Sequence, residues 1–209
     1  MKYLRAIFKD GFLLLAAFFI LLPTGFKLLW GMEGQVFVAQ PLANDPHFDH
    51  TVLYMVSHTI DGATAVILNR PYPLEKKNSI PSFVARRKIP VFWGGPVQDE
   101  TAIFVLEWQH SQSPKVMSLE SMLAQDIDIL DEIEKSPDRY RVLIGCARWQ
   151  ALQYEMERIS DIWVSGIKNS IIFPVIFSAP ALDGRDIWLK ALEDSDFYKG
   201  KPIKGKITA

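Results

Sequence analysis

The sequence has one cysteine, Cys146, and almost no net charge. A single cysteine excludes an internal disulfide and a cysteine-rich zinc site, and it leaves the cellular compartment open. The formal net charge is −1 and the isoelectric point is near 6.4, so the chain lacks the global basic excess that binding to a phosphate backbone usually needs. Nucleic acid is therefore a disfavoured partner.

Internal repeats and low-complexity stretches are also absent, which excludes repeat architectures and disordered tracts. The 209 residues are 49% hydrophobic, enough to bury the core of one full domain. Composition changes near Gly34. We therefore predict two parts: a basic flank with a hydrophobic membrane-anchor segment at residues 1–33, and a globular domain at residues 34–209.

The anchor prediction rests on an apolar run that follows three basic residues. The unbroken run covers residues 12–22, short of the roughly 20 residues that span a bilayer, unless the span continues through Pro23 and Lys27 to Trp30. An uncleaved anchor at Phe12–Trp30 is favoured over a cleaved signal peptide and over a buried or interfacial helix. Such an anchor predicts a membrane-associated protein, and its basic flank favours placing the domain outside.

Beyond residue 34 the chain has the pattern of an α+β domain. Short runs rich in valine, isoleucine and phenylalanine predict strands at residues 35–40, 51–57, 63–69, 102–108, 140–145 and 170–178. Helical spacing predicts helices at residues 118–133 and 147–165 and a shorter one from Asp186. In the second helix, one stripe contains Leu152, Met156, Ile159 and Trp163. Because strands and helices do not alternate regularly, we expect a mixed, curled sheet with helices packed outside.

The stretch "WGGP" at residues 93–96 predicts a fixed corner after a short strand. Two glycines allow backbone angles that are closed to other residues, and proline moves the preceding glycine away from the helical region. Such a corner either turns the chain or exposes backbone N–H groups to an anion or small polar ligand. The simple turn is the favoured interpretation.

Several motifs in order resemble the YqgE/AlgH family, also called UPF0301 or DUF179: "DPHF" at 45–48, "NRP" at 69–71 and "WGGPV" at 93–97. The resemblance extends from Gln35 to Leu192. It implies a bifurcated, barrel-like mixed β-sheet flanked by helices, to which this chain adds its N-terminal hydrophobic helix. It also implies a largely uncharacterised, mostly bacterial and cytoplasmic group, some of whose members are described as regulators of alginate synthesis. The hydrophobic segment before Gly34 and the sequence "GCARW" at 145–149 depart from the family pattern.

The best candidate for a ligand-binding surface combines Asn69 and Arg70 with Trp93, Gly94 and Gly95. An amide and a planar guanidinium at the end of a strand can bind a carboxylate, a phosphate or the protein's own backbone. Binding to its own backbone is the favoured alternative, since arginine at a strand end often fixes a neighbouring loop.

A second candidate is a basic connection that could contact an anionic surface. Its residues are Lys76, Lys77, Arg86, Arg87 and Lys88. Lipid headgroups and nucleic acid phosphates are possible partners of such a cluster, and an ordinary solvated loop is the favoured alternative.

The other polar groups have ordinary structural explanations. Cys146 follows a strand and is interpreted as an inert small hydrophobe, because no base is placed beside it. The histidines and aspartates of residues 44–50 are interpreted as a capped turn rather than a metal site. Glu155 and Glu157 are predicted to lie on a solvated surface. No catalytic residue, metal or cofactor is predicted.

The sequence favours a non-catalytic interaction or regulatory module with an unknown protein partner, tethered to the membrane through Phe12–Trp30, because no complete catalytic constellation is visible. A small-ligand binder or enzyme that uses the Asn69, Arg70 and Trp93–Pro96 surface is the first alternative. A DNA-binding transcriptional regulator is the second alternative.

Overall fold

The computed structural model describes residues 31–41, 45–87, 89–98, 101–109, 113–178 and 183–199. The strands are β1 Val36–Ala39, β2 Val52–Thr59, β3 Gly62–Ile67, β4 Val91–Trp93, β5 Ile103–Glu107, β6 Lys115–Ser118, β7 Tyr140–Ile144, β8 Ala147–Gln150 and β9 Trp163–Ile167. The helices are the 3-10 helix η1 Leu74–Ser79, then α2 Ser82–Ala85, α3 Leu119–Gln125, α4 Ile129–Lys135, α5 Gln153–Ile159, α6 Asn169–Ser178 and α7 Gly184–Asp194.

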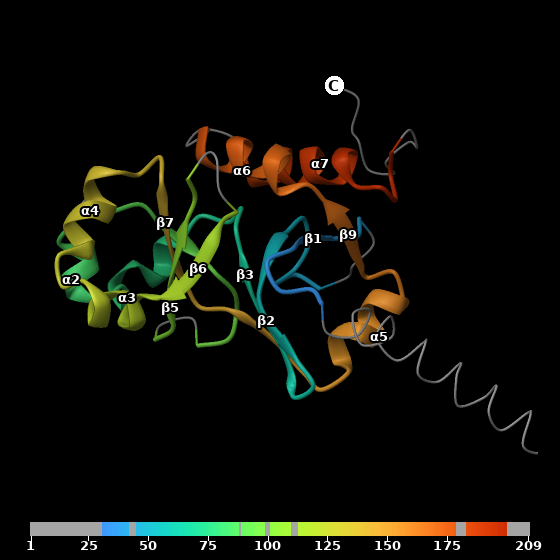
Figure 1. Cartoon of the computed structure of the whole chain (residues 1–209), viewed down its shortest axis with the longest axis horizontal. Coiled ribbons are helices and arrows are strands. Elements are labelled where there is room, and N and C mark those ends of the chain that lie inside the picture. The colour runs from blue at the N-terminus through green and yellow to red at the C-terminus, as the bar shows by residue number, and fades with distance from the viewer. Residues whose placement is uncertain are drawn as a thin grey trace, which may run out of the picture. The chain divides into compact units, whose positions relative to one another are not determined.

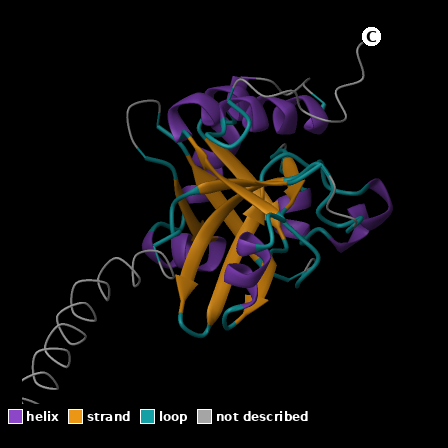
Figure 2. Ribbon diagram, turned by 90° about the vertical axis from the view of Figure 1, so that its right-hand side faces the viewer, coloured by secondary structure: helices purple, strands orange, loops and turns teal. Residues whose placement is uncertain are grey.

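The strands form two sheets at the centre of the domain, with the helices outside (Figures 1 and 2). The larger sheet has the order β8-β3-β2-β1-β9, and all its pairings are antiparallel. The smaller sheet has the order β4-β7-β5-β6 and is mixed, because β4 runs parallel to β7. The domain is therefore α+β, as predicted.

The barrel-like arrangement is not found, because the described strands form two open sheets and do not close into a barrel. The chain crosses from one sheet to the other within a few residues. Strand β7 ends at Ile144, and Gly145, with φ of 85°, redirects the chain into β8 of the larger sheet. This sharp change of direction separates strands that the sequence pattern had assigned to one curled sheet.

Two groups of helices cover the sheets (Figure 1). Helices α6 and α7 lie together along one side, where Phe173, Ile176 and Trp188 are buried in the main core with residues of both sheets. Helices α2, α3 and α4 contribute to a second core with β5 and β7. Helix α5 packs on the larger sheet near β8 and β9, at the opposite end of the view from α3 and α4.

The predicted helix at residues 147–165 is wrong. Its first four residues alternate buried and exposed and pair with β3, which makes them a strand. Leu152 and Asp161 have positive φ of 64° and 57°, so the helix between them is confined to α5. Trp163, predicted on the same stripe as Leu152, instead lies in β9.

Two further predictions need correction. The helix expected at 118–133 is two helices, because the chain leaves the helical conformation at Asp126 and turns before α4. Residues 170–178, predicted as a strand, belong to α6, which contains Pro174. Both aromatic and β-branched composition favoured a strand there, but a short apolar run does not separate a strand from a buried helix. The helix from Asp186 is confirmed as part of α7.

The prediction of a membrane-associated protein is also corrected. Among the residues that the structure describes, no helix has the length and apolar character needed to cross a bilayer. The predicted anchor, Phe12–Trp30, lies outside the described residues. The proposed boundary between residues 33 and 34 stays a prediction.

Candidate functional site

The corner at residues 93–97 joins the two sheets through its backbone. The Gly94 N–H donates to the Ile144 carbonyl at 2.7 Å, and the Gly94 carbonyl accepts from the Ile67 N–H at 2.8 Å. These two bonds attach the end of β4 to β7 in one sheet and to β3 in the other. The corner therefore holds the two sheets together.

Both glycines of the corner are required by close backbone contacts. A Cβ on Gly94 would lie 2.2 Å from the Gly145 carbonyl oxygen, and one on Gly95 would lie 2.3 Å from the Cys146 carbonyl carbon. Gly95 also has φ of 145°, which L side chains rarely adopt. The N–H of Val97 donates to the Cys146 carbonyl at 2.9 Å, so the corner's polar groups contact the protein itself.

Trp93, the first residue of this corner, is 7% exposed. Its ring is 5.5 Å from the guanidinium carbon of Arg70 and 6.2 Å from the centre of the His47 ring. The indole N–H is buried and has no hydrogen-bond acceptor among the described residues. The side chain is therefore part of the packed interior, as expected of a tryptophan that continues the apolar run of β4.

Asn69 fixes three segments through its side-chain amide. Its oxygen accepts from the Val52 N–H at 2.8 Å, and its nitrogen donates to the carbonyls of His50 at 2.8 Å and Gly184 at 2.7 Å. The residue is only 4% exposed. The amide therefore joins the start of β2, the preceding turn and the start of α7, and both of its polar atoms are already bonded.

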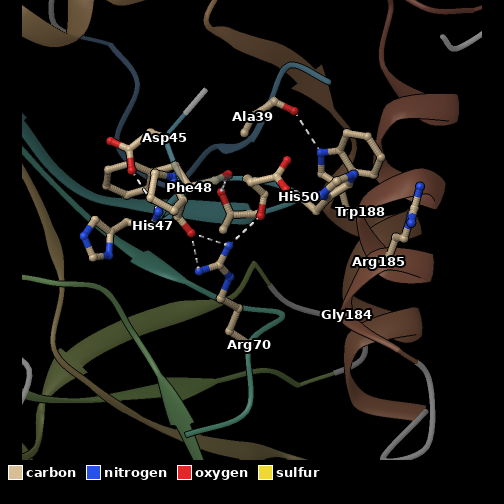
Figure 3. Close-up of polar contacts among 12 residues, drawn as sticks. Ala39, Asp45, His47, Phe48, His50, Arg70, Gly184, Arg185 and Trp188 are labelled. Atoms are coloured by element: carbon tan, nitrogen blue, oxygen red, sulfur yellow. Dashed lines mark hydrogen bonds and ion pairs between the residues drawn. The ribbon is translucent and has the colours of Figure 1, made fainter. Parts of the chain in front are cut away.

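Arg70 binds the loop that precedes β2 (Figure 3). Its guanidinium donates to the Pro46 carbonyl from both terminal nitrogens at 3.3 Å, and to the Asp49 carbonyl at 2.6 Å. Burial lowers the pKa of Arg70, and the carboxylates of Asp49 and Asp45 offset part of that effect. These contacts match the alternative in which Arg70 binds the protein's own backbone.

The histidines and aspartates of this loop form turns rather than a helix. The Asp45 carboxylate accepts from the His47 N–H at 2.8 Å, and the Asp49 carboxylate lies 2.7 Å from Nδ1 of His50. The His50 ring stands edge-on to Trp188, with ring centres 4.3 Å apart. Within the described part of the chain, no three histidine, cysteine or acidic side chains are grouped to hold a metal ion.

A small pocket of about 260 Å³ lies beside Asn69 and Arg70. It is lined by Asp49, His50, Asn69, Arg70, Pro71, Asp183, Gly184 and Arg185. Trp93, Gly94 and Gly95 are not among these residues, so the predicted surface does not converge on one pocket. A ligand site at Asn69, Arg70, Trp93, Gly94 and Gly95 stays a prediction.

Cys146 is fully buried beneath the corner. Burial raises the pKa of its thiol, and the neighbouring Arg148 offsets part of that rise. A thiol with a raised pKa is a poor nucleophile at neutral pH. The geometry agrees with the interpretation of Cys146 as a small core residue.

The basic connection is partly neutralised by α4. Arg87 contacts Asp131 and lies 3.3 Å from Glu134, and these acids belong to the facing helix. Arg86 donates from Nε to the Ser82 carbonyl at 3.1 Å. Lys88 lies outside the described residues. The contact of Lys76, Lys77, Arg86, Arg87 and Lys88 with an anionic surface stays a prediction.

The prediction that the two glutamates of α5 lie on a solvated surface is wrong. Glu155 is buried and its carboxylate lies 2.6 Å from Nε2 of His58 on β2. The Glu157 carboxylate accepts from the indole N–H groups of Trp149 and Trp163, each at 2.7 Å. Glu155 and Glu157 therefore face the domain. On the same side of the helix, Tyr154 of α5 belongs to an aromatic cluster with Phe37, Phe48, Trp149 and Trp163.

The opposite face of α5, together with Leu152 just before the helix, is apolar and exposed. Leu152 is 56% exposed, Met156 is 62% exposed and Ile159 is 72% exposed. We call these three residues the α5 face. Their spacing of four and three was visible in the sequence, but the sequence could not show which side of the helix faces the solvent.

The two-sheet α+β domain belongs to a known class. The family model described as AlgH-like, DUF179, matches residues 36–197. The chain therefore belongs to the AlgH-like family, and the resemblance seen in its motifs is confirmed.

Relatives and solved structures agree with this assignment. A UPF0301 protein of Legionella pneumophila strain Lens is 30% identical over 161 residues, which cover 72% of this chain and 86% of the relative. A UPF0301 protein of Marinomonas sp. strain MWYL1 is 31% identical over 137 residues, which cover 61% of this chain and 72% of the relative.

Two solved structures share the fold. The AlgH protein from Pseudomonas aeruginosa has a TM-score of 0.52 at 23% identity, and the match covers 79% of this chain and 87% of that one. Protein DIP2367 from Corynebacterium diphtheriae has a TM-score of 0.57 at 17% identity, with 78% and 86% covered. The family is uncharacterised, so these similarities define the fold and not an activity.

Proposed function

We propose that this chain is a non-catalytic interaction module that binds a protein partner through the α5 face. The observation that carries the proposal is the orientation of α5. A helix on the surface of a globular protein normally buries its apolar residues and exposes its charged ones. Helix α5 buries Tyr154 but otherwise departs from this pattern, because Glu155 and Glu157 face the domain. Met156 and Ile159, together with Leu152 just before the helix, face the solvent.

The inward contacts hold the α5 face in a fixed position. Glu155 binds His58, and Glu157 binds two tryptophans of the aromatic cluster. A binding surface that is already rigid loses less conformational entropy when a partner binds. Leu152 supports this interpretation, since its φ of 64° is an uncommon conformation for a residue other than glycine, and such strain is often found at functional positions.

The corner offers less support for a ligand-binding function. The side chains of Asn69 and Arg70 already bind backbone carbonyls and an N–H group of their own chain. A ligand would have to replace those bonds, and an internal polar group that loses its partner costs about 1–3 kcal/mol. The α5 face requires no such replacement.

A quantitative pull-down from the organism's own extract tests the proposal, with the tagged full chain compared with Met156→Glu and Ile127→Glu. Ile127 is the matched control, because it is 82% exposed and lies between α3 and α4, at the other end of the domain. We expect proteins retained by the wild type and by Ile127→Glu to be lost with Met156→Glu. A glutamate in place of Met156 would put an unpaired charge into an apolar contact, which opposes binding.

The same experiment includes Arg70→Gln, which alters the corner and leaves the α5 face unchanged. Retention of the same proteins by Met156→Glu, or their selective loss with Arg70→Gln, would contradict the proposal. All variants are first compared by circular dichroism, so that loss of binding is read only from folded protein.

A further inference from the structure

We infer that the partner of the α5 face is a second copy of this chain, packed antiparallel along α5 about a two-fold axis at Met156. The inference rests on the proposed function and names the partner that the α5 face would take. In such a pair the same surface of both copies forms the interface, so the surface must be complementary to itself.

The spacing of the α5 face meets that requirement. Leu152 lies four residues before Met156, and Ile159 lies three residues after it. In an antiparallel pair centred on Met156, Leu152 of each copy therefore lies opposite Ser160 and next to Ile159 of the other. Met156 lies opposite its own copy, where its flexible side chain can adapt to the contact.

The charge pattern also favours a second copy over a charged partner. Within residues 151–160 the exposed positions are all uncharged: Ala151, Leu152, Gln153, Met156, Ile159 and Ser160. Of the charged residues in this stretch, Glu155 is buried, and Glu157 and Arg158 are half-buried. The fully exposed positions at the centre of the pair therefore carry no charge. Asp161, the next exposed residue, would lie opposite Ala151 of the copy, and the two Asp161 side chains would stand at opposite ends of the interface.

A fourth exposed apolar residue lies near this surface. Ile60 is 61% exposed at the tip of the β2–β3 hairpin, and the adjoining Gly62 pairs with Gln150 just before α5. The hairpin tip and the start of α5 thus lie at the same end of the larger sheet (Figure 1). Even with Ile60 the surface is small beside the roughly 800 Å² per partner of standard interfaces, so we expect a weak, reversible dimer.

Cysteine cross-linking of the full chain tests this arrangement. The only natural cysteine, Cys146, is fully buried, so an added surface cysteine supplies the accessible thiol. Under mild oxidation, Met156→Cys should form a covalent dimer on a non-reducing gel at a yield about tenfold above that of Ile127→Cys, because residues at the axis are held close together. A mixture of Leu152→Cys and Ile159→Cys chains should form the mixed dimer in preference to either homodimer.

Each other outcome counts against the inference. Equal cross-linking of Ile127→Cys would indicate random collision, and a preference of Leu152→Cys for itself would exclude the antiparallel arrangement. An adduct of Met156→Cys with a different protein would overturn the second copy as partner while supporting the proposed function. No adduct of any kind, from protein that unfolds at the wild-type temperature, would count against both.

Discussion

The corner region and the α5 face differ in the residues they contain and in the contacts of those residues. The corner and its neighbours Asn69, Arg70 and Cys146 contain the most reactive groups of this region: an amide, a guanidinium, an indole and a thiol. All four groups are bonded or buried within the domain. The α5 face contains three apolar side chains without ionisable groups, and it is exposed. These polar groups thus maintain the fold, and the surface that we propose for a partner is apolar.

The comparison also predicts which substitutions change stability and which change binding. Residues that connect two sheets and a helix should affect the free energy of unfolding when they are changed. Exposed residues of the α5 face should affect it little, since surface substitutions usually change stability by less than about 0.5 kcal/mol. The following variants test that division, from the largest expected effect to the smallest.

Gly95→Ala should be the most damaging change. The added Cβ would collide with the backbone at Cys146, and φ of 145° is unfavourable for alanine, so we expect a loss of about 3–5 kcal/mol of unfolding free energy. Gly34→Ala is the matched control, because Gly34 also has positive φ but its Cβ would meet only the Tyr54 hydroxyl at 3.6 Å. That control should cost about 1 kcal/mol. Equal losses in urea unfolding would show that the close contact at the corner is unimportant.

Trp93→Ala should cost about 3–5 kcal/mol, the usual range for a buried tryptophan. Trp93→Phe should cost much less, about 1 kcal/mol, since it keeps most of the apolar volume and removes a buried N–H that has no acceptor among the described residues. Thermal unfolding of both variants measures the difference. An alanine variant that unfolds at the wild-type temperature would mean that the corner is not part of the core.

Asn69→Ala should cost about 2–4 kcal/mol, because it leaves the Val52 N–H and the carbonyls of His50 and Gly184 without their partner. Asn78→Ala provides the control, since Asn78 is exposed, and should change stability by less than about 0.5 kcal/mol. Equilibrium urea unfolding of the two variants gives the comparison. A stable Asn69→Ala chain would reopen the corner as a ligand site.

The Cys146 thiol should react slowly in the folded protein. Burial raises its pKa, so the reactive thiolate is scarce at pH 8, and we expect a disulfide reagent to label the native chain at least about tenfold more slowly than the urea-unfolded chain. Because the folded pKa lies above the unfolded value, the folded chain retains this proton more tightly. The resulting stabilisation is complete below the unfolded pKa and is lost as pH rises through the folded pKa. Fast labelling of native protein at neutral pH would contradict the account.

The sequence predicted the family and most strands because those features depend on local motifs and on short apolar runs. "NRP" and "WGGPV" mark the corner correctly, and β1, β2, β3, β5 and β7 follow runs of valine, isoleucine and phenylalanine. The predictions for residues 147–165 and 170–178 are wrong, because the conformation of these residues depends on contacts with distant parts of the chain. Pairing with β3 makes β8 a strand, and burial against both sheets allows α6 to be helical despite Pro174.

The α5 face could not be predicted from the sequence for a similar reason. The spacing of Leu152, Met156 and Ile159 indicated an apolar stripe, which by itself is typical of a buried face. Only the structure brings Glu155 to His58 and Glu157 to two tryptophans, with the stripe facing outward. Polar partners outside the helix, one of them 97 residues away in the sequence, therefore accompany the outward orientation of the stripe.

The most direct test of the central claim is the unfolding temperature of the full chain as a function of protein concentration, for the wild type and for Met156→Glu. A dimer that forms only from folded chains makes the unfolding temperature rise with concentration. We expect that rise in the wild type and its absence in Met156→Glu, with both chains unfolding at the same temperature when dilute, because an exposed methionine contributes little to the fold. A wild-type unfolding temperature independent of concentration, or a dilute Met156→Glu chain that unfolds several degrees lower, would contradict the account.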